Sequence, residues 1–222
     1  MDIAVSLKNT SKVFVTGGTQ VNAISHVSFD IPEGSFWIIA GPSGSGKTTL
    51  LNLIGGLDRA TSGEVAIGTM DLGGMDEQAL ALYRRRRVGF IFQGNNLITS
   101  LTAFENVELP LILTGASHRK SKVQAILEEI GLRDKHHMFP QYLSAGEQQR
   151  VALARAVVHS PKIVLADEPT ANLDAKTGTE ILTLLQRLNK NLKRTILLST
   201  HDPRIIENSE HVLRLSDGKL DL

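Results

Sequence analysis

The feature that most constrains the fold is a glycine-rich loop between a buried strand and a helix. The apolar run Phe36–Ala40 is typical of a strand buried on both faces, and Thr48–Leu57 has the pattern of a helix. The loop between them consists of Gly41, Pro42, Ser43, Gly44, Ser45, Gly46, Lys47 and Thr48. Its glycines let backbone N–H groups point inward, and the following helix adds the positive end of its dipole. This order of strand, loop and helix predicts a phosphate-binding loop.

Side chains at the loop and at a second strand end complete the chemistry of such a site. Lys47 is long enough to reach the β- and γ-phosphates, and the Thr48 hydroxyl is a ligand for Mg²⁺. Asp167 and Glu168 end the apolar strand Ile163–Ala166, and ligands bind at strand ends of this kind in open α/β sheets. We expect Asp167 to hold Mg²⁺ through water and Glu168 to orient and polarise the attacking water. A salt-bridged acidic pair with only a structural role is the alternative.

Two further polar residues follow predicted strands. Gln93 comes after Val88–Phe92, where a neutral amide can ligate Mg²⁺ and point at the water. His201 comes after Thr195–Thr200, where it can contact the γ-phosphate and hold the water in line. Each residue alone would mean little, because a lone histidine is most often structural and a glutamine after a strand is unremarkable. Their position at strand ends is what makes them candidates.

The remaining pattern predicts an α/β fold. Alternation over residues 3–7 and 27–31, with the turn Gly17-Gly18 between them, indicates antiparallel strands with one buried face. Residues 104–137 turn helical, helices are expected over 147–159 and 175–191, and Val212–Leu215 is the last strand. We expect one domain over residues 1–222. In it, 1–94 and 156–222 form the β-subdomain and catalytic core, and 95–155 form a helical subdomain.

Composition excludes several classes of protein. The formal net charge is +1, so nucleic acid is not an expected partner, and the absence of cysteine excludes disulfides and thiolate metal sites. The start lacks a basic end followed by an apolar core, so we do not expect these residues to act as a signal peptide. No apolar run approaches the ~20 residues that span a bilayer, so any membrane role is expected to be peripheral.

A second motif, Leu143–Gln148, precedes another predicted helix. Ser144 and Glu147 have the Ser-x-x-Glu spacing of a capping box, and the helix start they cap is also a potential anion site. Together with the residues above, this motif resembles the ABC ATPases over Leu7–Leu215. Gln93 matches the Q-loop, Leu143–Gln148 the signature, and Asp167 with Glu168 the Walker B pair. Asn172-Leu173-Asp174 matches the D-loop and His201 the switch histidine.

The resemblance implies a P-loop NTPase fold with a RecA-like parallel core, ATP and Mg²⁺ as ligands, and a head-to-tail homodimer. Each ATP would lie between the phosphate loop of one copy, Thr49 included, and the signature of the other. Contacts in trans would come from Ser144, Ala145, Gly146, Glu147 and Asp174. The usual signature reads Leu-Ser-Gly-Gly-Gln, so Ala145 is a departure; its methyl disfavours positive φ where backbone approaches phosphate.

The resemblance also implies an aromatic residue that stacks on adenine. Phe14 is the candidate, and a buried core phenylalanine is the alternative. Stacking on Phe14 alone would discriminate poorly among purines, because the ring lacks a hydroxyl.

Within the family, Tyr83–Val107 and Pro169–Asp174 look like the lipoprotein-releasing and macrolide-exporting (LolD/MacB-type) subfamily. This implies an integral membrane permease that docks near Gln93–Leu101, and a peripheral location on the cytoplasmic face of the inner membrane. Leu97, Ile98 and Leu101 suit a docking groove but are equally compatible with a local core. The arginine run at 84–87 suggests either a charged contact surface or a solvated helix end.

Two other functions compete with a transport subunit. A soluble ABC ATPase of the DNA-repair or translation type would carry two cassettes or a long coiled-coil insertion, for which this chain has little room. A P-loop kinase or GTPase would leave Leu143–Gln148 and His201 unexplained. The resemblance implies that specificity for the transported substrate lies in the membrane subunit, so this chain is not expected to select the substrate.

Overall fold

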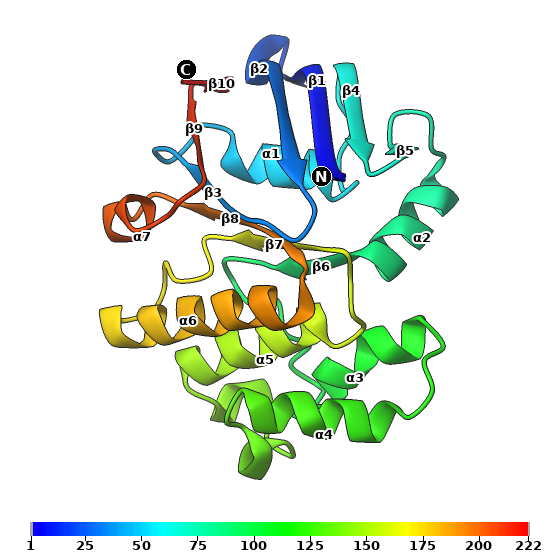
Figure 1. The fold of residues 1–222 in the computed structure, drawn as a ribbon, viewed down its shortest axis with the longest axis vertical. Helices are drawn as coiled ribbons and strands as arrows, with labels where there is room; N and C mark the ends of the chain where they lie inside the picture. The colour runs from blue at the N-terminus through cyan, green and yellow to red at the C-terminus, as the bar shows by residue number, and fades with distance from the viewer. Residues whose placement is uncertain (1, 222) are drawn as a thin grey trace.

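The computed structural model describes residues 2–221, apart from the side chains of Thr16 and Leu192. Two sheets and a group of helices are stacked in layers (Figure 1). An antiparallel sheet holds the N-terminal strands, a mostly parallel sheet lies in the middle, and helices cover the far face of the parallel sheet. This confirms the predicted α/β fold with an antiparallel β-subdomain and a parallel core.

The antiparallel sheet has the order β2-β1-β4-β5. Its strands are β1 (Ile3–Thr16), β2 (Thr19–Pro32), β4 (Ser62–Ile67) and β5 (Met70–Asp71). The predicted turn at Gly17-Gly18 joins β1 to β2, and both glycines have positive φ (57° and 83°), as a two-residue hairpin turn requires. The two strands are much longer than the stretches of alternation that predicted them.

The second sheet has the order β10-β9-β3-β8-β7-β6, and all its pairings are parallel except that of β9 with β10. Its strands are β3 (Phe36–Ala40), β6 (Val88–Ile91), β7 (Ile163–Asp167), β8 (Thr195–Thr200), β9 (Val212–Ser216) and β10 (Lys219–Leu220). Since β3, β8, β7 and β6 run parallel, their carboxyl ends meet at one edge.

The parallel strands separate two hydrophobic cores. Successive side chains point to opposite faces, so Ile38 and Val164 enter the core shared with the helices, whereas Ile39 and Leu165 enter the core under the antiparallel sheet. All four are buried. This two-sided burial explains why the strands read as continuous apolar runs in the sequence.

Helix α1 lies between the two sheets, and α3 to α6 lie beyond the parallel sheet (Figure 1). The helices are α1 (Lys47–Ile54), α2 (Glu77–Arg87), α3 (Ala103–Leu113), α4 (Arg119–Glu129), α5 (Ala145–Val157), α6 (Ala175–Leu192) and α7 (Pro203–Glu207). Two 3₁₀ turns, η1 (Arg133–Lys135) and η2 (Pro140–Tyr142), precede α5.

Several helix boundaries differ from the sequence prediction, among them the end of α5, which is Val157 rather than 159. Helix α1 ends at Ile54 rather than at 57, because Gly55 caps it and Gly56 takes a left-handed φ of 64°. Helix α5 begins at Ala145 rather than at 147, because Ser144 is its N-cap.

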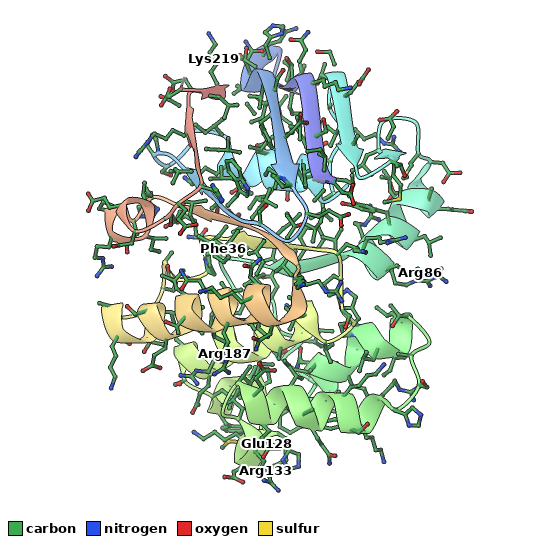
Figure 2. The ribbon with its side chains drawn as sticks, in the orientation of Figure 1. Phe36, Arg86, Glu128, Arg133, Arg187 and Lys219 are labelled. Atoms are coloured by element: carbon green, nitrogen blue, oxygen red, sulfur yellow. The ribbon has the colours of Figure 1, made fainter. Side chains whose placement is uncertain are left out.

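The arginine run forms the last turn of α2. Arg84 pairs with Glu77 at 2.6 Å, and Figure 2 shows the Arg86 side chain pointing away from the protein. Positive charge at a helix C-terminus interacts favourably with the helix dipole, so the arginines stabilise the end of α2. This favours the interpretation of the run as a solvated helix end. None of the helices within residues 2–221 is both long and apolar enough to cross a membrane.

Candidate functional site

The carboxyl ends of β3, β6, β7 and β8 open into a hollow of ≈ 580 Å³, here called the phosphate-loop pocket. The predicted site residues that line it are Ser43, Gly44, Gly46, Lys47, Thr48, Thr49, Gln93, Glu168 and His201. The residues that the sequence did not point to are Val21, Asn22, Ala23 and Asp217. Of the other predicted residues, Gly41, Pro42, Ser45, Asp167 and Phe14 lie outside this lining.

The glycines of the loop serve two different needs. Gly46 is the N-cap of α1 with φ of 105°, a conformation that side chains rarely adopt. A Cβ at Gly41 would instead lie 2.2 Å from the Leu215 carbonyl oxygen, so this glycine is needed for packing against β9. Ser45 is buried, and its N–H donates to the Pro42 carbonyl at 3.2 Å, which closes the turn.

Lys47 is held inside the loop that it belongs to. Its ammonium donates to the carbonyls of Gly41 and Pro42, both at 2.9 Å, and lies 3.4 Å from Glu168 Oε1. The side chain is only 5% exposed. A buried cation with carbonyl partners on one side and a carboxylate on the other is placed to receive a phosphate.

Asp167 is fixed by two hydroxyl groups. Thr48 Oγ1 donates to Asp167 Oδ2 at 2.8 Å, and Ser199 Oγ donates to Asp167 Oδ1 at 2.5 Å. Ser199 also accepts a bond from the Glu168 N–H at 3.0 Å. Ser199 was not among the residues predicted for the site. The signal was a polar residue near the carboxyl end of a buried strand.

Glu168 has a left-handed backbone, with φ of 45°. Such a conformation costs on the order of 1–3 kcal/mol in a residue other than glycine and is often found at functional sites. It directs the carboxylate between two cationic or titratable partners: Oε1 faces Lys47, and Oε2 lies 3.0 Å from His201 Nδ1. The structure therefore brings together three residues that lie far apart in the sequence.

The loop after β6 is anchored from two other elements. The Gln93 carbonyl accepts a bond from Asn172 Nδ2 at 3.2 Å. Asn95 and Asn96 both have positive φ, 59° and 48°, and their carbonyls accept bonds of 2.7 and 2.6 Å from the Arg155 guanidinium. Burial lowers the pKa of Arg155, which lies on α5. Arg155 is a second residue that the sequence did not single out.

A second hollow, here called the signature pocket, encloses ≈ 530 Å³. The predicted residues that line it are Ser144, Ala145, Gly146, Glu147, Asn172, Leu173 and Asp174. The predicted capping box is present: Ser144 Oγ accepts from the Glu147 N–H at 3.3 Å, and Glu147 Oε2 accepts from the Ser144 N–H at 3.0 Å.

The positive φ considered for Ala145 is not found. Ala145 is the first residue of α5 and has a helical backbone, so its methyl group opposes no positive φ. Gly146 is the restrictive position, because a Cβ there would lie 2.5 Å from Thr177 Cγ2 on α6.

Asp174 is the N-cap of α6. Its Oδ1 accepts from the Thr177 N–H at 3.0 Å and its Oδ2 accepts from the Thr177 hydroxyl at 2.6 Å. These bonds hold the pKa of Asp174 below its usual range. Both carboxylate oxygens are therefore committed to the cap.

The two pockets share no residue. Within one chain, the signature therefore does not complete the site around the phosphate loop.

Comparison with known proteins identifies the family. The sequence model of the ABC transporter family matches residues 24–171. The chain belongs to this family. The lipoprotein-releasing system ATP-binding protein LolD of Legionella pneumophila is 41% identical over 99% of this chain and 97% of its own length. The macrolide export ATP-binding/permease protein MacB of Bradyrhizobium diazoefficiens is 42% identical over 96% of this chain but only 33% of its own length.

A solved structure shows the same cassette fold. It is the ATP-binding cassette of a Methanocaldococcus jannaschii protein, a dimer in a post-hydrolysis state with ADP and Pi. The TM-score is 0.91 at 43% identity, and the match covers 98% of this chain and 97% of that one. This chain is therefore an ABC ATPase, and the resemblance to the LolD and MacB cassettes is confirmed.

Phe14 lies beside the phosphate-loop pocket of this ABC ATPase rather than in its lining. It is 39% exposed, so the alternative of a buried core residue is wrong. Phe14 pairs directly with Val21, which does line the pocket, and paired residues share one face of a sheet. The Lys12 ammonium lies 4.8 Å from the centroid of the Phe14 ring.

The segment after Gln93 is only partly exposed. Leu97 packs against the helical core, while Ile98 is 41% exposed. The buried side chain of Asn106 holds this loop, accepting from the Ile98 N–H at 2.9 Å and donating to the Leu101 carbonyl at 3.0 Å. Of the apolar residues that suggested a docking groove, Ile98 is thus the one presented to solvent.

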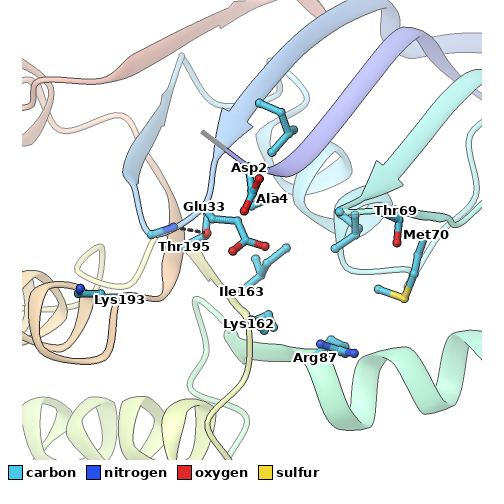
Figure 3. A pocket seen from close by; sticks show the side chains of 14 residues that line it. Asp2, Ala4, Glu33, Thr69, Met70, Arg87, Lys162, Ile163, Lys193 and Thr195 are labelled. Carbon is cyan, nitrogen blue, oxygen red and sulfur yellow. Dashed lines mark hydrogen bonds between the residues drawn. The ribbon is translucent and has the colours of Figure 1, made fainter.

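A third hollow lies at the opposite, amino-terminal end of the parallel strands (Figure 3). Charged side chains of both signs line it, among them Asp2, Glu33, Arg87 and Lys162. It contains no residue that the sequence predicted for the site.

Proposed function

We propose that this chain is the ATP-hydrolysing subunit of an ABC transporter and acts as a head-to-tail homodimer. The observation that carries the proposal is the separation of the phosphate-loop pocket from the signature pocket on one chain. Two copies related head to tail would bring each phosphate-loop pocket against the partner's signature pocket. Each ATP would then be enclosed by both.

In this arrangement the phosphate-loop residues bind the nucleotide of their own chain. Lys47 exchanges its carbonyl partners for the β- and γ-phosphates, and the N–H groups at the start of α1 face the same phosphates. Phe14 supplies a face for the adenine ring, beside Val21. Ser144, Gly146 and Asp174 face the nucleotide of the partner, and the Ser144 hydroxyl donates to its γ-phosphate.

Glu168 is the residue best placed to activate water. Its carboxylate lines the pocket, and its orientation is fixed by Lys47, by His201 and by the bond that its own N–H donates to Ser199. Glu168 would accept the proton as water attacks the γ-phosphate. His201 holds the carboxylate in place and faces the γ-phosphate, while Gln93 approaches the water from the end of β6, on the other side of β7 from His201.

The oxygen atoms of Thr48, Asp167 and Gln93 fit a Mg²⁺ ion that is bound mainly by phosphates and water. Magnesium prefers oxygen ligands and usually takes only one or two from protein. Thr48 and Asp167 already lie in mutual contact at 2.8 Å, and residues 2–221 contain no cluster of three or more acidic or histidine ligands. When bound, the ion neutralises charge that develops on the phosphate oxygens.

The membrane partner would be a permease that docks near Gln93–Leu101, placing the cassette on the cytoplasmic face of the membrane. This chain is similar to LolD, which is named as part of a lipoprotein-releasing system, and to MacB, which is named as a macrolide export protein. Ile98 supports the docking site as an exposed apolar residue. Ile98→Asp should abolish recovery of the protein with membranes that contain its permease, while ATP hydrolysis in solution is retained. A variant that stays membrane-bound would argue against this docking site.

The head-to-tail arrangement is tested by mixing two inactive variants. Lys47→Ala disables the phosphate loop, and Ser144→Glu disables the signature. In a mixed dimer, the intact loop of one chain meets the intact signature of the other, so ATP hydrolysis should reappear on mixing. If both variants are inactive and the mixture stays inactive although mixed dimers form, the shared site is refuted.

A further inference from the structure

We propose that Lys135 is a positioning residue that neutralises Glu147 and so allows the signature helix to receive the γ-phosphate bound by a second copy of the chain. The inference rests on the proposed head-to-tail function and names a residue outside the family motifs. It concerns Glu147, the fifth residue of the signature, where the usual sequence has glutamine.

Glu147 lies where the γ-phosphate of the partner's nucleotide would arrive. It is in the first turn of α5, and its Oε2 accepts from the Ser144 N–H at 3.0 Å. Its carboxylate is thus held against the residue whose hydroxyl would donate to the phosphate. A glutamine there would be neutral, whereas a glutamate places a negative charge beside an incoming polyanion.

Lys135 offsets that charge directly. Its ammonium lies 2.5 Å from Glu147 Oε1, and this bond is the main reason why the pKa of Glu147 is lowered. The pair is partly exposed, 45% for Lys135 and 22% for Glu147. An exposed pair of this kind adds little to folding stability, so its effect is expected in ligand binding rather than in the fold.

The other charges at the signature pocket do not replace Lys135. Asp174 and Glu180 add negative charge to the lining, and Arg150 is the cation that lines it. Arg150 is committed to Glu180 at 2.6 Å and to the Ile130 carbonyl at 3.0 Å. Carboxylates therefore outnumber cations in the lining, and Lys135 is the cation bound to Glu147.

The backbone fixes Lys135 in this position. Lys135 ends the turn η1, with its N–H donating to the Leu132 carbonyl at 3.1 Å and its carbonyl accepting from the Met138 N–H at 3.0 Å. The Met138 carbonyl in turn accepts from the Ala103 N–H at 2.8 Å, which ties the turn to the start of α3. The ammonium is held at Glu147 by a structured segment.

The test is a cycle of four proteins in a Glu168→Gln background, which keeps ATP bound: the parent, Lys135→Met, Glu147→Gln and the double variant. The readout is the ATP-dependent monomer–dimer equilibrium by sedimentation at several salt concentrations. We expect Lys135→Met to weaken the dimer at low salt by about tenfold for each of its two equivalent nucleotide sites, the size expected for one uncompensated charge ~6 Å from another at an intermediate dielectric. The loss should shrink as salt rises.

Glu147→Gln should rescue the lysine variant, because no carboxylate remains to be neutralised. Arg133→Met is the matched control: it removes a cation from the same turn that pairs with Glu128 at 3.1 Å. It should leave the dimer unchanged. ATP binding to the monomer should be equal in all variants, since the phosphate loop is untouched.

Three results would overturn the role of Lys135: a loss that the double variant keeps in full, a loss equal to that of Arg133→Met, or no loss at all. A parent protein that binds ATP but never dimerises would instead refute the head-to-tail function. The two failures are therefore distinguishable.

Discussion

A side chain at Gly146 would collide with Thr177, because a Cβ built there lies 2.5 Å from Thr177 Cγ2. Thr177 has no freedom to move aside, since its hydroxyl and its N–H are both bonded to Asp174, at 2.6 and 3.0 Å. The second glycine of the signature is thus required where α5 meets the start of α6. The signature and the D-loop are joined through this contact.

We therefore expect Gly146→Ala to cost about 1–3 kcal/mol of stability, the usual penalty for inserting a methyl group into a packed contact. Denaturant unfolding measures this loss, and ATP-dependent dimer formation should fall with it. Thr177→Ser removes the colliding Cγ2 but keeps the hydroxyl for Asp174, so the double variant should recover most of the loss. A double variant as unstable as Gly146→Ala would show that the glycine is needed for another reason.

Glu168→Gln should slow ATP hydrolysis by about 10²–10⁴-fold, since the amide cannot accept the proton of the attacking water. ATP binding should persist because Lys47 is unchanged, and an ATP-bound dimer should accumulate in size-exclusion chromatography. The matched control is Lys47→Ala, which should lose nucleotide binding itself and form no such dimer. Normal hydrolysis by Glu168→Gln would remove Glu168 from the catalytic role.

The sequence predicted the order of elements well and the contacts between them poorly. The strand Phe36–Ala40, the loop and the start of α1 were predictable because their signals are local: an apolar run, spaced glycines and a helix pattern. Asp167 and Ser199 illustrate the contrary case. They face each other because β7 and β8 pair in parallel with this register, which no local pattern specifies.

The same limit applies to the candidate site. Gln93 and His201 were found because each follows a strand whose carboxyl end faces the pocket. Thr177, Arg155 and Lys135 were missed because each acts through a partner on another element. The crowding at Gly146 was also missed, because it is decided by how α5 packs on α6.

Ser199→Ala should disturb both acidic residues at once, because its hydroxyl donates to Asp167 and accepts from the Glu168 N–H. We expect the free energy of unfolding to fall by about 1–3 kcal/mol, because buried polar groups are left without hydrogen-bond partners. The Mg²⁺ concentration for half-maximal ATP hydrolysis should rise, because Asp167 loses its orientation. Ser35→Ala is the control, since that hydroxyl bonds to the Pro32 carbonyl at 2.6 Å, at the other end of β3. An equal rise in both variants would count against a specific role.

Arg155→Met should lower hydrolysis more than ATP binding. The guanidinium holds two consecutive carbonyls in left-handed backbone, so its loss frees the loop that positions Gln93. Hydrogen bonds from a charged donor contribute about 1.5–3 kcal/mol to stability. Arg155→Lys should restore only part of the hydrolysis rate, because an ammonium cannot bridge both carbonyls as the planar guanidinium does. Hydrogen exchange of residues 93–98 should increase. Tyr83→Phe, which removes a buried bond to the Ile54 carbonyl at 2.7 Å, is a control for destabilisation away from this loop. Faster exchange in both variants alike would contradict the prediction.

His159 makes stability depend on pH near and below the usual histidine pKa of about 6.5. Burial lowers the pKa of His159, and its Nε2 faces the Val88 carbonyl at 3.2 Å, so the neutral ring with the proton on Nε2 fits this site. Nδ1 is buried and has no hydrogen-bond partner among the described residues, which disfavours a second proton.

Stability decreases as the pH falls, because the unfolded chain binds a proton at His159 more readily than the folded chain does. Below a pH of about 6.5 the unfolded chain takes up a proton at this histidine that the folded chain resists, so stability falls on acidification by at most about 1.4 kcal/mol per pH unit. The carboxylates whose pKa is lowered, such as Glu147 and Asp174, lose their contribution only at lower pH. His159→Gln keeps a donor for Val88 but does not titrate, so its unfolding free energy, measured in denaturant across this range, should fall less steeply than that of the parent. Equal slopes would exclude His159 as the source.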